Sequence, residues 1–401
     1  MSKLYLLNRE SFSCAFQNKR GEERMKKILF AFVLLVSAAI LFACGPREYQ
    51  IAMITDSGDI DDRSFNQGTW EGIKEFAKDN NKTYKYYKPT AITLDAYVAA
   101  IDLAVKGGAE IIVTPGFLFE NSVHKAQSLY PDVKFILIDG SPHNVADWGT
   151  MATYDNAAMD FTIGENTLSI FFQEEQSGFF AGYASVKEGH DVLGFMGGMA
   201  VPAVVRFGAG YVAGAYYAAQ EMGLTTFSFP ANRYAYLNTF APDDAIVTQA
   251  TSWFNAGVDI IHAAAGGAGL SVMTAAENTG KWMVGVDVDQ SNLNNKVLTS
   301  AMKGLAVAVQ SALDDFFKGE FEGGISITLG AAEEAVGLPT ASGSWRFTTF
   351  TVAQYNAIFT LVSNGTIVVP TDRATMQAFI TARGFTADIT TLLNAIFGPA
   401  A

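Results

Sequence analysis

The sequence predicts an α/β protein built as two lobes, each on a mainly parallel sheet. The first observation is that short continuous apolar runs end in turn residues, as at residues 111–116 and 135–140. Runs of this kind are typical of parallel strands buried on both faces. The second observation is that the alternation of strand and helix starts again near Val192. Two successive series of this length indicate two lobes, with right-handed crossovers between the strands of each.

The chain is long and apolar enough to bury large cores. It has 401 residues, of which 49% are hydrophobic and 17% are charged. This balance is typical of a globular protein with two or three domains' worth of chain, and it excludes a chain that is disordered as a whole.

The N-terminal region predicts export. Met25-Lys26-Lys27 opens an apolar run at residues 28–43 that only Ser37 interrupts. A basic start followed by such a run is typical of a secretory signal, and the run is shorter than the roughly 20 residues that a membrane-spanning helix needs. Residues 1–24 are expected to be an upstream extension, so the sequence leaves open whether translation starts at Met1 or Met25.

A lipid anchor is expected directly after this run. Residues 41–44, Leu-Phe-Ala-Cys, look like a bacterial lipobox, so residues 25–43 would be removed as a signal peptide and Cys44 would carry the lipid. The alternative is an N-terminal transmembrane anchor followed by an incidental cysteine. The only other cysteine, Cys14, lies upstream of the cut, so the mature chain could form no internal disulfide.

The charge of the mature chain argues against nucleic acid as a partner. The whole chain has 27 Lys and Arg against 40 Asp and Glu; removal of residues 1–43 takes away seven and three of these, which leaves 20 against 37 and a net charge of −17. Binding of nucleic acid or of an anionic membrane surface needs a basic face, which this composition does not favour.

The first strand, residues 51–55, leads into an acidic turn that begins at Asp56. A helical pattern follows, and its apolar positions are Trp70, Ile73, Phe76 and Ala77. In open α/β sheets, ligands bind at the carboxyl ends of strands, where helix N-termini point N–H groups into the crevice. A solvated turn is the alternative. A calcium loop is rejected, because it would need oxygen ligands or Glu where Gly58, Ile60 and Gln67 stand.

The remaining elements follow in order. A helix after Thr93 is expected to bury Leu94, Val98, Ile101 and Val105 and to end at residues 107–108. Strands are then expected at residues 111–116, 135–140, 167–172, 192–198, 226–229, 258–262 and 282–287, and helices from about Ser177 and at 353–363. Beyond Pro370 only two apolar pieces, 376–380 and 392–397, stand out.

Acidic residues recur at one topological position. Asp139 and Asp287 end predicted strands as Asp56 does, and acceptor-only carboxylates suit a ligand rich in O–H and N–H donors. Any one of them could be a solvated loop acid. Lys303 follows a further apolar run and is expected to neutralise this acidic site and to donate to a hydroxyl; the alternative is a surface lysine at a helix start.

Motifs for catalysis or metal binding are missing from the sequence. It contains no Gly-x-Ser-x-Gly, His-Glu-x-x-His or Cys-x-x-Cys, and its four histidines lack close metal-ligand spacing. His262 lies in a buried strand pattern and is expected to be a satisfied structural histidine. The glycines at residues 266–269 match neither a dinucleotide fingerprint nor a P-loop, so they indicate either a backbone approach to a neutral polyol at Gly267 or a simple turn.

Several strings in order and spacing resemble the Bmp (basic membrane protein) family of ABC-transporter substrate-binding lipoproteins, especially its purine nucleoside receptor branch. The resemblance runs from about Tyr49 to Pro370, and the matching strings lie at residues 55–62, 64–67, 265–267, 285–287, 298–300 and 335–339. It implies a type 1 periplasmic-binding fold whose lobes are joined by three crossings. Lobe one would comprise 48–165 and 295–325, lobe two 166–294 and 326–370, and the tail 371–401 has no assigned role.

The resemblance also implies a site and partners. Phe65 from lobe one and Phe207 from lobe two would clasp a nucleobase, although without the resemblance Phe207 would be interpreted as a core residue. Asp139 would bind the base edge, and Asp287, Gly267 and Lys303 the ribose, while Asp56 and Asn66 complete the ligand-binding set. An ABC permease with a separate ATPase would receive the ligand at the extracytoplasmic side of the membrane, with no cofactor, metal or covalent step.

The sequence departs from the receptor pattern at two positions, and two alternative functions remain open. Pro202 and Arg206 stand in a segment that is otherwise apolar and Met-rich in the receptors, which leaves the nucleobase open; Arg206 could line the pocket mouth or face solvent. A receptor of the same fold for a sugar or another small signal would keep the carboxylates without needing both rings. A nucleoside-cleaving enzyme is the alternative from a different class.

Overall fold

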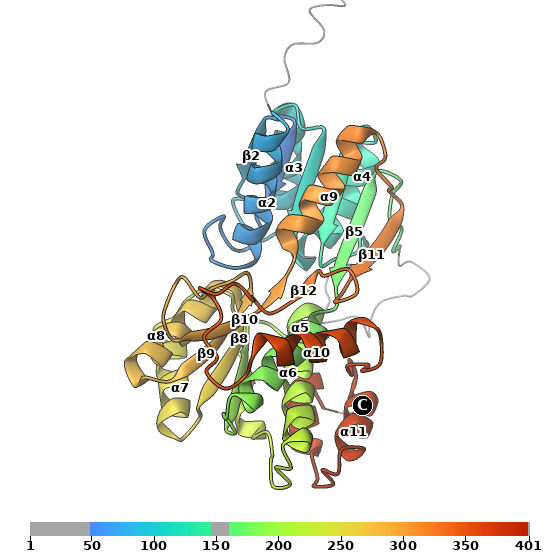
Figure 1. The fold of residues 1–401 in the computed structure, drawn as a ribbon. Helices are drawn as coiled ribbons and strands as arrows, with labels where there is room; N and C mark the ends of the chain where they lie inside the picture. Colours follow the sequence, from blue (N-terminus) through green and yellow to red (C-terminus); the bar gives the residue numbers. More distant parts are fainter. Residues whose placement is uncertain (1–48, 146–159, 400–401) are drawn as a thin grey trace, which may run out of the picture. The chain divides into compact units, whose positions relative to one another are not determined.

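The computed structural model describes residues 49–145 and 160–399, and it shows two α/β lobes that each contain a six-stranded sheet (Figure 1). The predicted signal peptide and Cys44 lie outside the described residues. Within the described part of the chain, no helix is long and apolar enough to cross a membrane.

The sheet of the first lobe is parallel throughout, in the order β11-β5-β4-β3-β1-β2. Its strands are β1 (Ile51–Ile54), β2 (Tyr84–Tyr87), β3 (Ile111–Pro115), β4 (Lys134–Ile138), β5 (Thr167–Phe172) and β11 (Ile325–Leu329). Its helices are α2 (Phe65–Asp79), α3 (Leu94–Lys106), η1 (Phe117–Phe119), α4 (Glu120–Leu129) and α9 (Leu305–Lys318). The inner strands β1, β3 and β4 are buried almost throughout, as their continuous apolar runs predict.

The second lobe repeats this order as β12-β10-β9-β8-β6-β7, with β12 antiparallel to β10. Its strands are β6 (Leu193–Gly197), β7 (Tyr234–Tyr236), β8 (Ile260–Ala264), β9 (Trp282–Asp287), β10 (Val297–Lys303) and β12 (Val336–Gly337). Its helices are α5 (Glu174–Lys187), α6 (Pro202–Glu221), η4 (Ala231–Arg233), α7 (Asp244–Asn255), η5 (Gly266–Ala268) and α8 (Gly269–Thr279).

The chain passes between the sheets three times, but later than the predicted lobe boundaries. β5 pairs with β4 in the first sheet, so the first passage follows Phe172 instead of residue 165. β10 pairs with β9 in the second sheet, so the segment from 295 joins lobe one only after Lys303. The third passage lies between β11 and β12. An apolar strand has the same local pattern in either sheet, and only its long-range pairing decides which sheet it joins.

Two element predictions were wrong in detail. The helix after Thr93 forms, but it buries Tyr97, Ala100, Ile101 and Ala104, while Leu94 is 44% exposed. The buried face of this helix is therefore rotated about the helix axis from the face that the sequence pattern predicted. The strand expected at residues 226–229 does not form, and β7 lies at Tyr234–Tyr236.

Helices α5 and α6 approach almost backbone to backbone in the second lobe. A Cβ added at Gly210 would lie 1.9 Å from the carbonyl oxygen of Glu175, and one at Gly214 would lie 2.0 Å from that of Phe179. Only glycine permits this separation. The packing fixes the first half of α6, from which Phe207 projects.

The end of the chain packs on the second lobe. It forms α10 (Val352–Ser363), α11 (Arg373–Thr381) and α12 (Thr390–Phe397), and α10 lies against α5 while α11 and α12 lie against α6 (Figure 1). The ring of Phe379 contacts that of Phe179, and the Tyr236 hydroxyl donates to the carbonyl of Ile396 over 2.8 Å. The two apolar pieces beyond Pro370 are thus the buried faces of helices.

Candidate ligand-binding site

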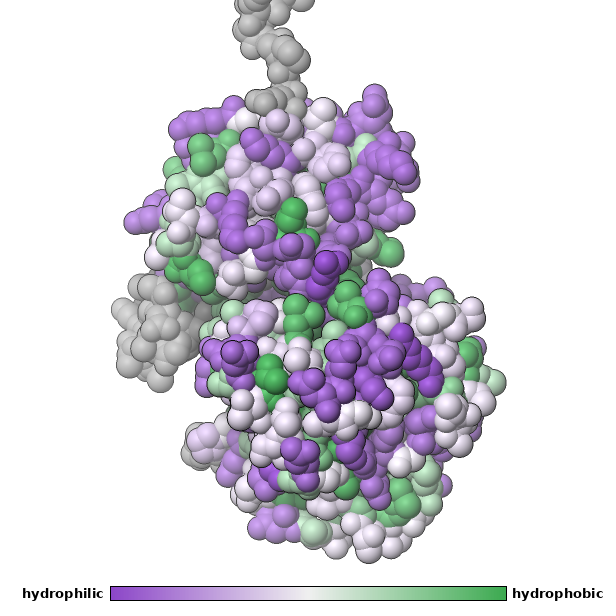
Figure 2. Space-filling view, turned by 90° about the vertical axis from the view of Figure 1, so that its left-hand side faces the viewer, coloured by the Kyte–Doolittle hydropathy of each residue, from purple (hydrophilic) through white to green (hydrophobic). Residues whose placement is uncertain are grey.

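One cavity of about 720 Å³ lies between the lobes. All eight predicted ligand-binding residues line it, namely Asp56, Phe65, Asn66, Asp139, Phe207, Gly267, Asp287 and Lys303. The carboxyl ends of β1, β4, β9 and β10 supply most of the polar groups, because parallel strands end at one edge of each sheet. Figure 2 shows hydrophobic residues where the surfaces of the two lobes meet.

The loop after β1 is organised by two carboxylates and one amide. The side chain of Asn66, buried in the first turn of α2, donates to Asp56 Oδ1 over 2.8 Å and to Asp62 Oδ2 over 2.9 Å. Asp62 also accepts from the backbone N–H groups of Ser64, Asn66 and Gln67, so it caps α2. Burial raises the pKa of Asp56 to about 6, against the opposing hydrogen bonds from Gly58 and Asn66.

The two phenylalanines come from different lobes and face the same ammonium group. Lys303 Nζ lies 4.7 Å from the ring centroid of Phe65 and 5.6 Å from that of Phe207. Phe207 is only 2% exposed and contacts His262 edge-on, with ring centroids 6.0 Å apart. Phe207 therefore packs in the core of the second lobe and lines the cavity as well.

Lys303 is buried among three carboxylates. Its ammonium pairs with Asp139, with Glu174 at 3.1 Å and with Asp287 at 3.9 Å. Burial alone would lower the pKa of Lys303, but these three negative charges raise it above its usual value, so the side chain carries a proton at neutral pH. The surface-lysine alternative is wrong.

Asp139 directly follows β4 with a φ of 55°, in the left-handed region that non-glycine residues rarely adopt. One carboxylate oxygen, Oδ2, takes the ion pair with Lys303. The other, Oδ1, is buried and has no hydrogen-bond partner among the described residues. Burial raises the pKa of Asp139 to about 7, although the neighbouring Lys303 opposes this shift.

Asp287 ends β9 with the same backbone twist, at a φ of 64°. Its Oδ2 accepts a hydrogen bond from the Ser64 hydroxyl at 2.5 Å, and its other oxygen faces Lys303. Burial raises the pKa of Asp287 as well, while Lys303 and Ser64 lower it. Asp139 and Asp287 therefore lie on opposite lobes, and Lys303 pairs with both.

Gly267 lies in the short helix η5 at the carboxyl end of β8. A Cβ at this position would come within 3.2 Å of the carbonyl oxygen of Phe240, whose segment also lines the cavity. A larger residue would therefore crowd the wall. The exposed apolar side chains of Ile92 and Met199, one from each lobe, also line the cavity.

Sequence reasoning missed Glu174 and the position of Arg206. Glu174 is fully buried, and it binds Arg206 Nε at 2.6 Å as well as Lys303. Burial alone would raise the pKa of Glu174, but the charges of Lys303 and Arg206 lower it. Arg206, whose side chain is 25% exposed, pairs with Glu174 and is not among the residues that line the cavity. Glu174 follows β5 by two residues, so the signal that identified the other strand-end carboxylates was present.

His262 is buried, as predicted, but only one of its ring nitrogens has a partner. Nδ1 lies 3.3 Å from the carbonyl oxygen of Val284, whereas Nε2 has no hydrogen-bond partner among the described residues. Burial lowers its pKa to about 4, so the ring is neutral. In the described part of the chain, no group of three or more His, Cys, Asp or Glu side chains could hold a metal ion.

Comparison with known families gives one match over most of the chain. A family described as "ABC transporter substrate-binding protein PnrA-like" (Bmp) matches residues 49–371. Helices α11 and α12 thus lie entirely beyond the matched region.

Similar sequences carry related descriptions. A "CD4+ T-cell-stimulating antigen" of Listeria monocytogenes is 29% identical over 78% of this chain and 91% of its own length. "Basic membrane protein B" of Borreliella burgdorferi is 28% identical over 89% and 98%. An "ABC transporter nucleoside-binding protein BmpA" of Lactococcus lactis is 26% identical over 76% and 89%.

A solved structure shows the same fold. The solute-binding protein of an ABC transporter system from Aeropyrum pernix superposes with a TM-score of 0.67, at 21% identity, over 86% of this chain and 99% of its own. This likeness supports the two-lobed periplasmic-binding architecture.

Proposed function

Because the chain belongs to the Bmp (PnrA-like) family of ABC transporter substrate-binding proteins, we propose that its ligand is a nucleoside, with a purine as the preferred base. The cavity between the lobes would hold this ligand, and a membrane permease with a separate ATPase would receive it. The relative from Lactococcus lactis is named as a nucleoside-binding protein, which supports this choice of ligand.

The observation that carries the proposal is that two aromatic rings and one buried hydrogen-bond acceptor occur in the same cavity. Phe65 and Phe207 line the same cavity from different lobes. Asp139 Oδ1 is buried in this cavity and has no hydrogen-bond partner among the residues that the structure describes. A buried acceptor that stays unpaired costs about 1–3 kcal/mol, so a ligand N–H would gain that much by reaching it. A base stacked on an aromatic ring gains about 1–3 kcal/mol as well.

The remaining polar groups of the cavity suit a sugar. Asp287 can accept from ribose hydroxyl groups through its Oδ1, and Lys303 can donate to one. Gly267 lets the backbone of η5 lie against the ligand without a side chain between them. Binding of this kind needs no covalent step, so we propose a receptor and not an enzyme.

We also propose that the receptor is anchored by a lipid on Cys44, facing the extracytoplasmic side. The lipobox-like residues 41–44 support this. Replacing Cys44 with Ser and following the processed protein through detergent partitioning tests the anchor, because unchanged partitioning would contradict it.

Mass spectrometry of the ligand that copurifies with the full chain in detergent tests the proposed ligand class. We expect a purine nucleoside at close to one per protein. A bound hexose or another small signal would favour the sugar-receptor alternative. Incubation of the protein with inosine for hours should release no hypoxanthine; a steady release that an Asp287→Ala variant lacks would instead indicate the nucleoside-cleaving enzyme.

A further inference from the structure

Several residues of the strings that carry the family resemblance do not line the ligand cavity. Ser64, Gly285 and Ser300 are examples. All three lie where the first turn of α2 in lobe one meets the loop after β9 in lobe two. The contacts at this junction suggest a use for them.

The first contact is the hydrogen bond from Ser64 Oγ to Asp287 Oδ2, at 2.5 Å. It connects the two lobes and is fully buried, because Ser64 has no exposed surface. Ser64 also precedes Phe65 directly, at the start of α2. One bond therefore influences both the orientation of the Asp287 carboxylate and the position of the Phe65 ring.

The second contact joins Gln290 to the backbone of Arg63, whose carbonyl accepts from Gln290 Nε2 at 2.8 Å. Gln290 is itself held in lobe two, because its N–H donates to Ser300 Oγ at 3.0 Å and its Oε1 accepts from the N–H of Val286 at 3.3 Å. A Cβ at Gly285 would lie 2.4 Å from that Oε1. Gly285 and Ser300 thus serve to seat Gln290.

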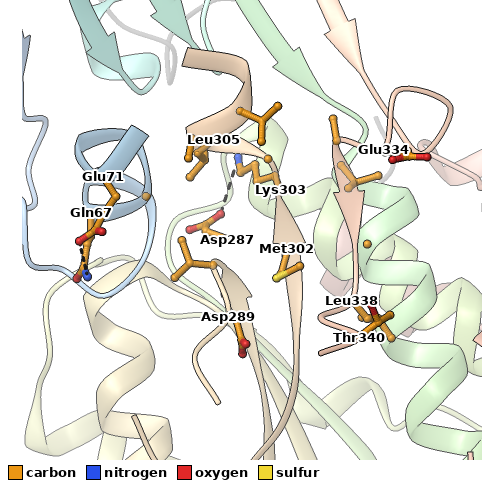
Figure 3. Close-up of a pocket in the computed structure, with 18 of the residues that line it drawn as sticks. Gln67, Glu71, Asp287, Asp289, Met302, Lys303, Leu305, Glu334, Leu338 and Thr340 are labelled. Atoms are coloured by element: carbon orange, nitrogen blue, oxygen red, sulfur yellow. Dashed lines mark hydrogen bonds and ion pairs between the residues drawn. The ribbon is translucent and has the colours of Figure 1, made fainter. Parts of the chain in front are cut away.

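The two lobes come close enough here to need a glycine. A Cβ at Gly68, one turn along α2, already has Val288 Cγ1 within 2.8 Å. A second hollow of about 710 Å³ opens on this side, and it shares Asp287 and Lys303 with the ligand cavity. In Figure 3, Gln67 and Glu71 of α2 lie to the left of Asp287 and Asp289, while Glu334 and Thr340 lie to their right. Asp287 and Lys303 thus form part of the wall between the two hollows.

We propose that Ser64 and Gln290 form an inter-lobe clasp that positions Asp287 for the ligand and docks the first turn of α2 on lobe two. The ligand role of the clasp rests on the proposed function, since it assumes that Asp287 binds a ribose. The clasp holds one oxygen of Asp287 from lobe one and leaves the other oriented toward Lys303 and the ligand. Ser64 and Gln290 are positioning residues, because they act through Asp287 and Phe65.

A buried hydrogen bond to a charged group contributes enough that its loss should weaken binding by about ten- to a hundredfold. We expect the full chain in detergent with Ser64→Ala to lose inosine affinity in this range, mainly through faster dissociation. The loss should be smaller for 2′,3′-dideoxyinosine, which lacks the 2′- and 3′-hydroxyl groups that Asp287 would accept from. Ser64→Ala in an Asp287→Ala background should add little further loss, because the partner is already gone. Ser252→Ala, an exposed serine on α7, is the matched control.

Hydrogen exchange without ligand separates the clasp from a local role of Ser64. If the clasp joins the lobes, Ser64→Ala and Gln290→Ala should each speed amide exchange at residues 63–68 and also at 286–291. Faster exchange at 63–68 alone in Ser64→Ala, or unchanged inosine dissociation, would overturn the clasp. If the wild type binds no nucleoside at all, the proposed function fails, whereas the exchange result still decides whether the clasp exists. Unfolding temperatures of both variants, which we expect to remain well above the assay temperature, check that they fold.

Discussion

At the scale of single residues, Asp139 and Asp287 share a strand-end position and a left-handed backbone but differ in how many of their carboxylate oxygens already have a partner. Asp139 keeps a buried oxygen without a partner among the described residues, whereas both oxygens of Asp287 face a neighbour, Ser64 or Lys303. Asp139 is therefore expected to discriminate among bases and Asp287 to serve any ribose. Removal of a base-edge acceptor removes discrimination worth about 1–3 kcal/mol.

This difference predicts opposite patterns for two variants. Asp139→Ala should flatten the preference among inosine, guanosine, adenosine and a pyrimidine nucleoside. Asp287→Ala should weaken all ribonucleosides together and narrow their advantage over deoxy analogues. Titration calorimetry of both variants measures this, and an Asp139→Ala variant that keeps the wild-type order of bases would contradict the assignment.

Buried acids also predict how stability depends on pH. Burial raises the pKa of Glu175 to about 7, and its Oε2 has no hydrogen-bond partner among the described residues. A carboxyl whose pKa is higher in the folded chain than in the unfolded chain stabilises the fold below its unfolded pKa, and this contribution is lost as pH rises toward 7. Asp56 and Asp139 act in the same direction.

Glu175→Gln should therefore raise the unfolding temperature at pH 8 more than at pH 5, because the variant has no buried charge to form. Calorimetry of the ligand-free protein at both pH values measures the difference. The exposed Glu71→Gln serves as control and should change neither value appreciably. A larger gain for Glu175→Gln at pH 5 than at pH 8 would show that the sign is wrong.

At the scale of elements, the two rings of the site are held in different ways. Phe65 is partly exposed at the start of α2, while Phe207 is buried in α6 against His262. Phe65→Ala and Phe207→Ala should each weaken nucleoside binding by about 1–3 kcal/mol. Only Phe207→Ala should also destabilise the ligand-free fold, by about 3–5 kcal/mol, since it leaves a cavity in a packed core. Denaturant unfolding and calorimetry separate the two, and equal stability losses would contradict this distinction.

The contact of α5 with α6 gives a second prediction at this scale. Gly210→Ala would force a methyl group against the Glu175 carbonyl, so we expect a loss of about 1–3 kcal/mol or more from overpacking. Gly343→Ala is a matched control, because nothing lies within 4 Å of an added Cβ there. Denaturant unfolding compares the two. Equal stability in both variants would mean that the helices can separate at little cost.

At the scale of the whole molecule, local sequence patterns predict the buried inner strands and the strand-end carboxylates well, but they misplace β7. β5 and β9 form over the predicted residues 167–172 and 282–287, and all eight expected site residues line one cavity. The sheet that β5 and β10 join was not predictable in this way, because long-range pairing decides it. The partners of Glu174 and Ser64 were hidden for the same reason, since Lys303 and Asp287 lie far away in sequence.

The central claim is that the cavity selects a nucleoside through both its base and its sugar. Titration calorimetry of the full chain in detergent with inosine, free ribose and hypoxanthine tests it most directly. We predict that inosine binds at least a hundredfold more tightly than either fragment, because the two rings and Asp139 bind the base while Asp287 and Lys303 bind the ribose. If free ribose binds as tightly as inosine, the base contributes nothing, and the protein is a sugar receptor with the same fold.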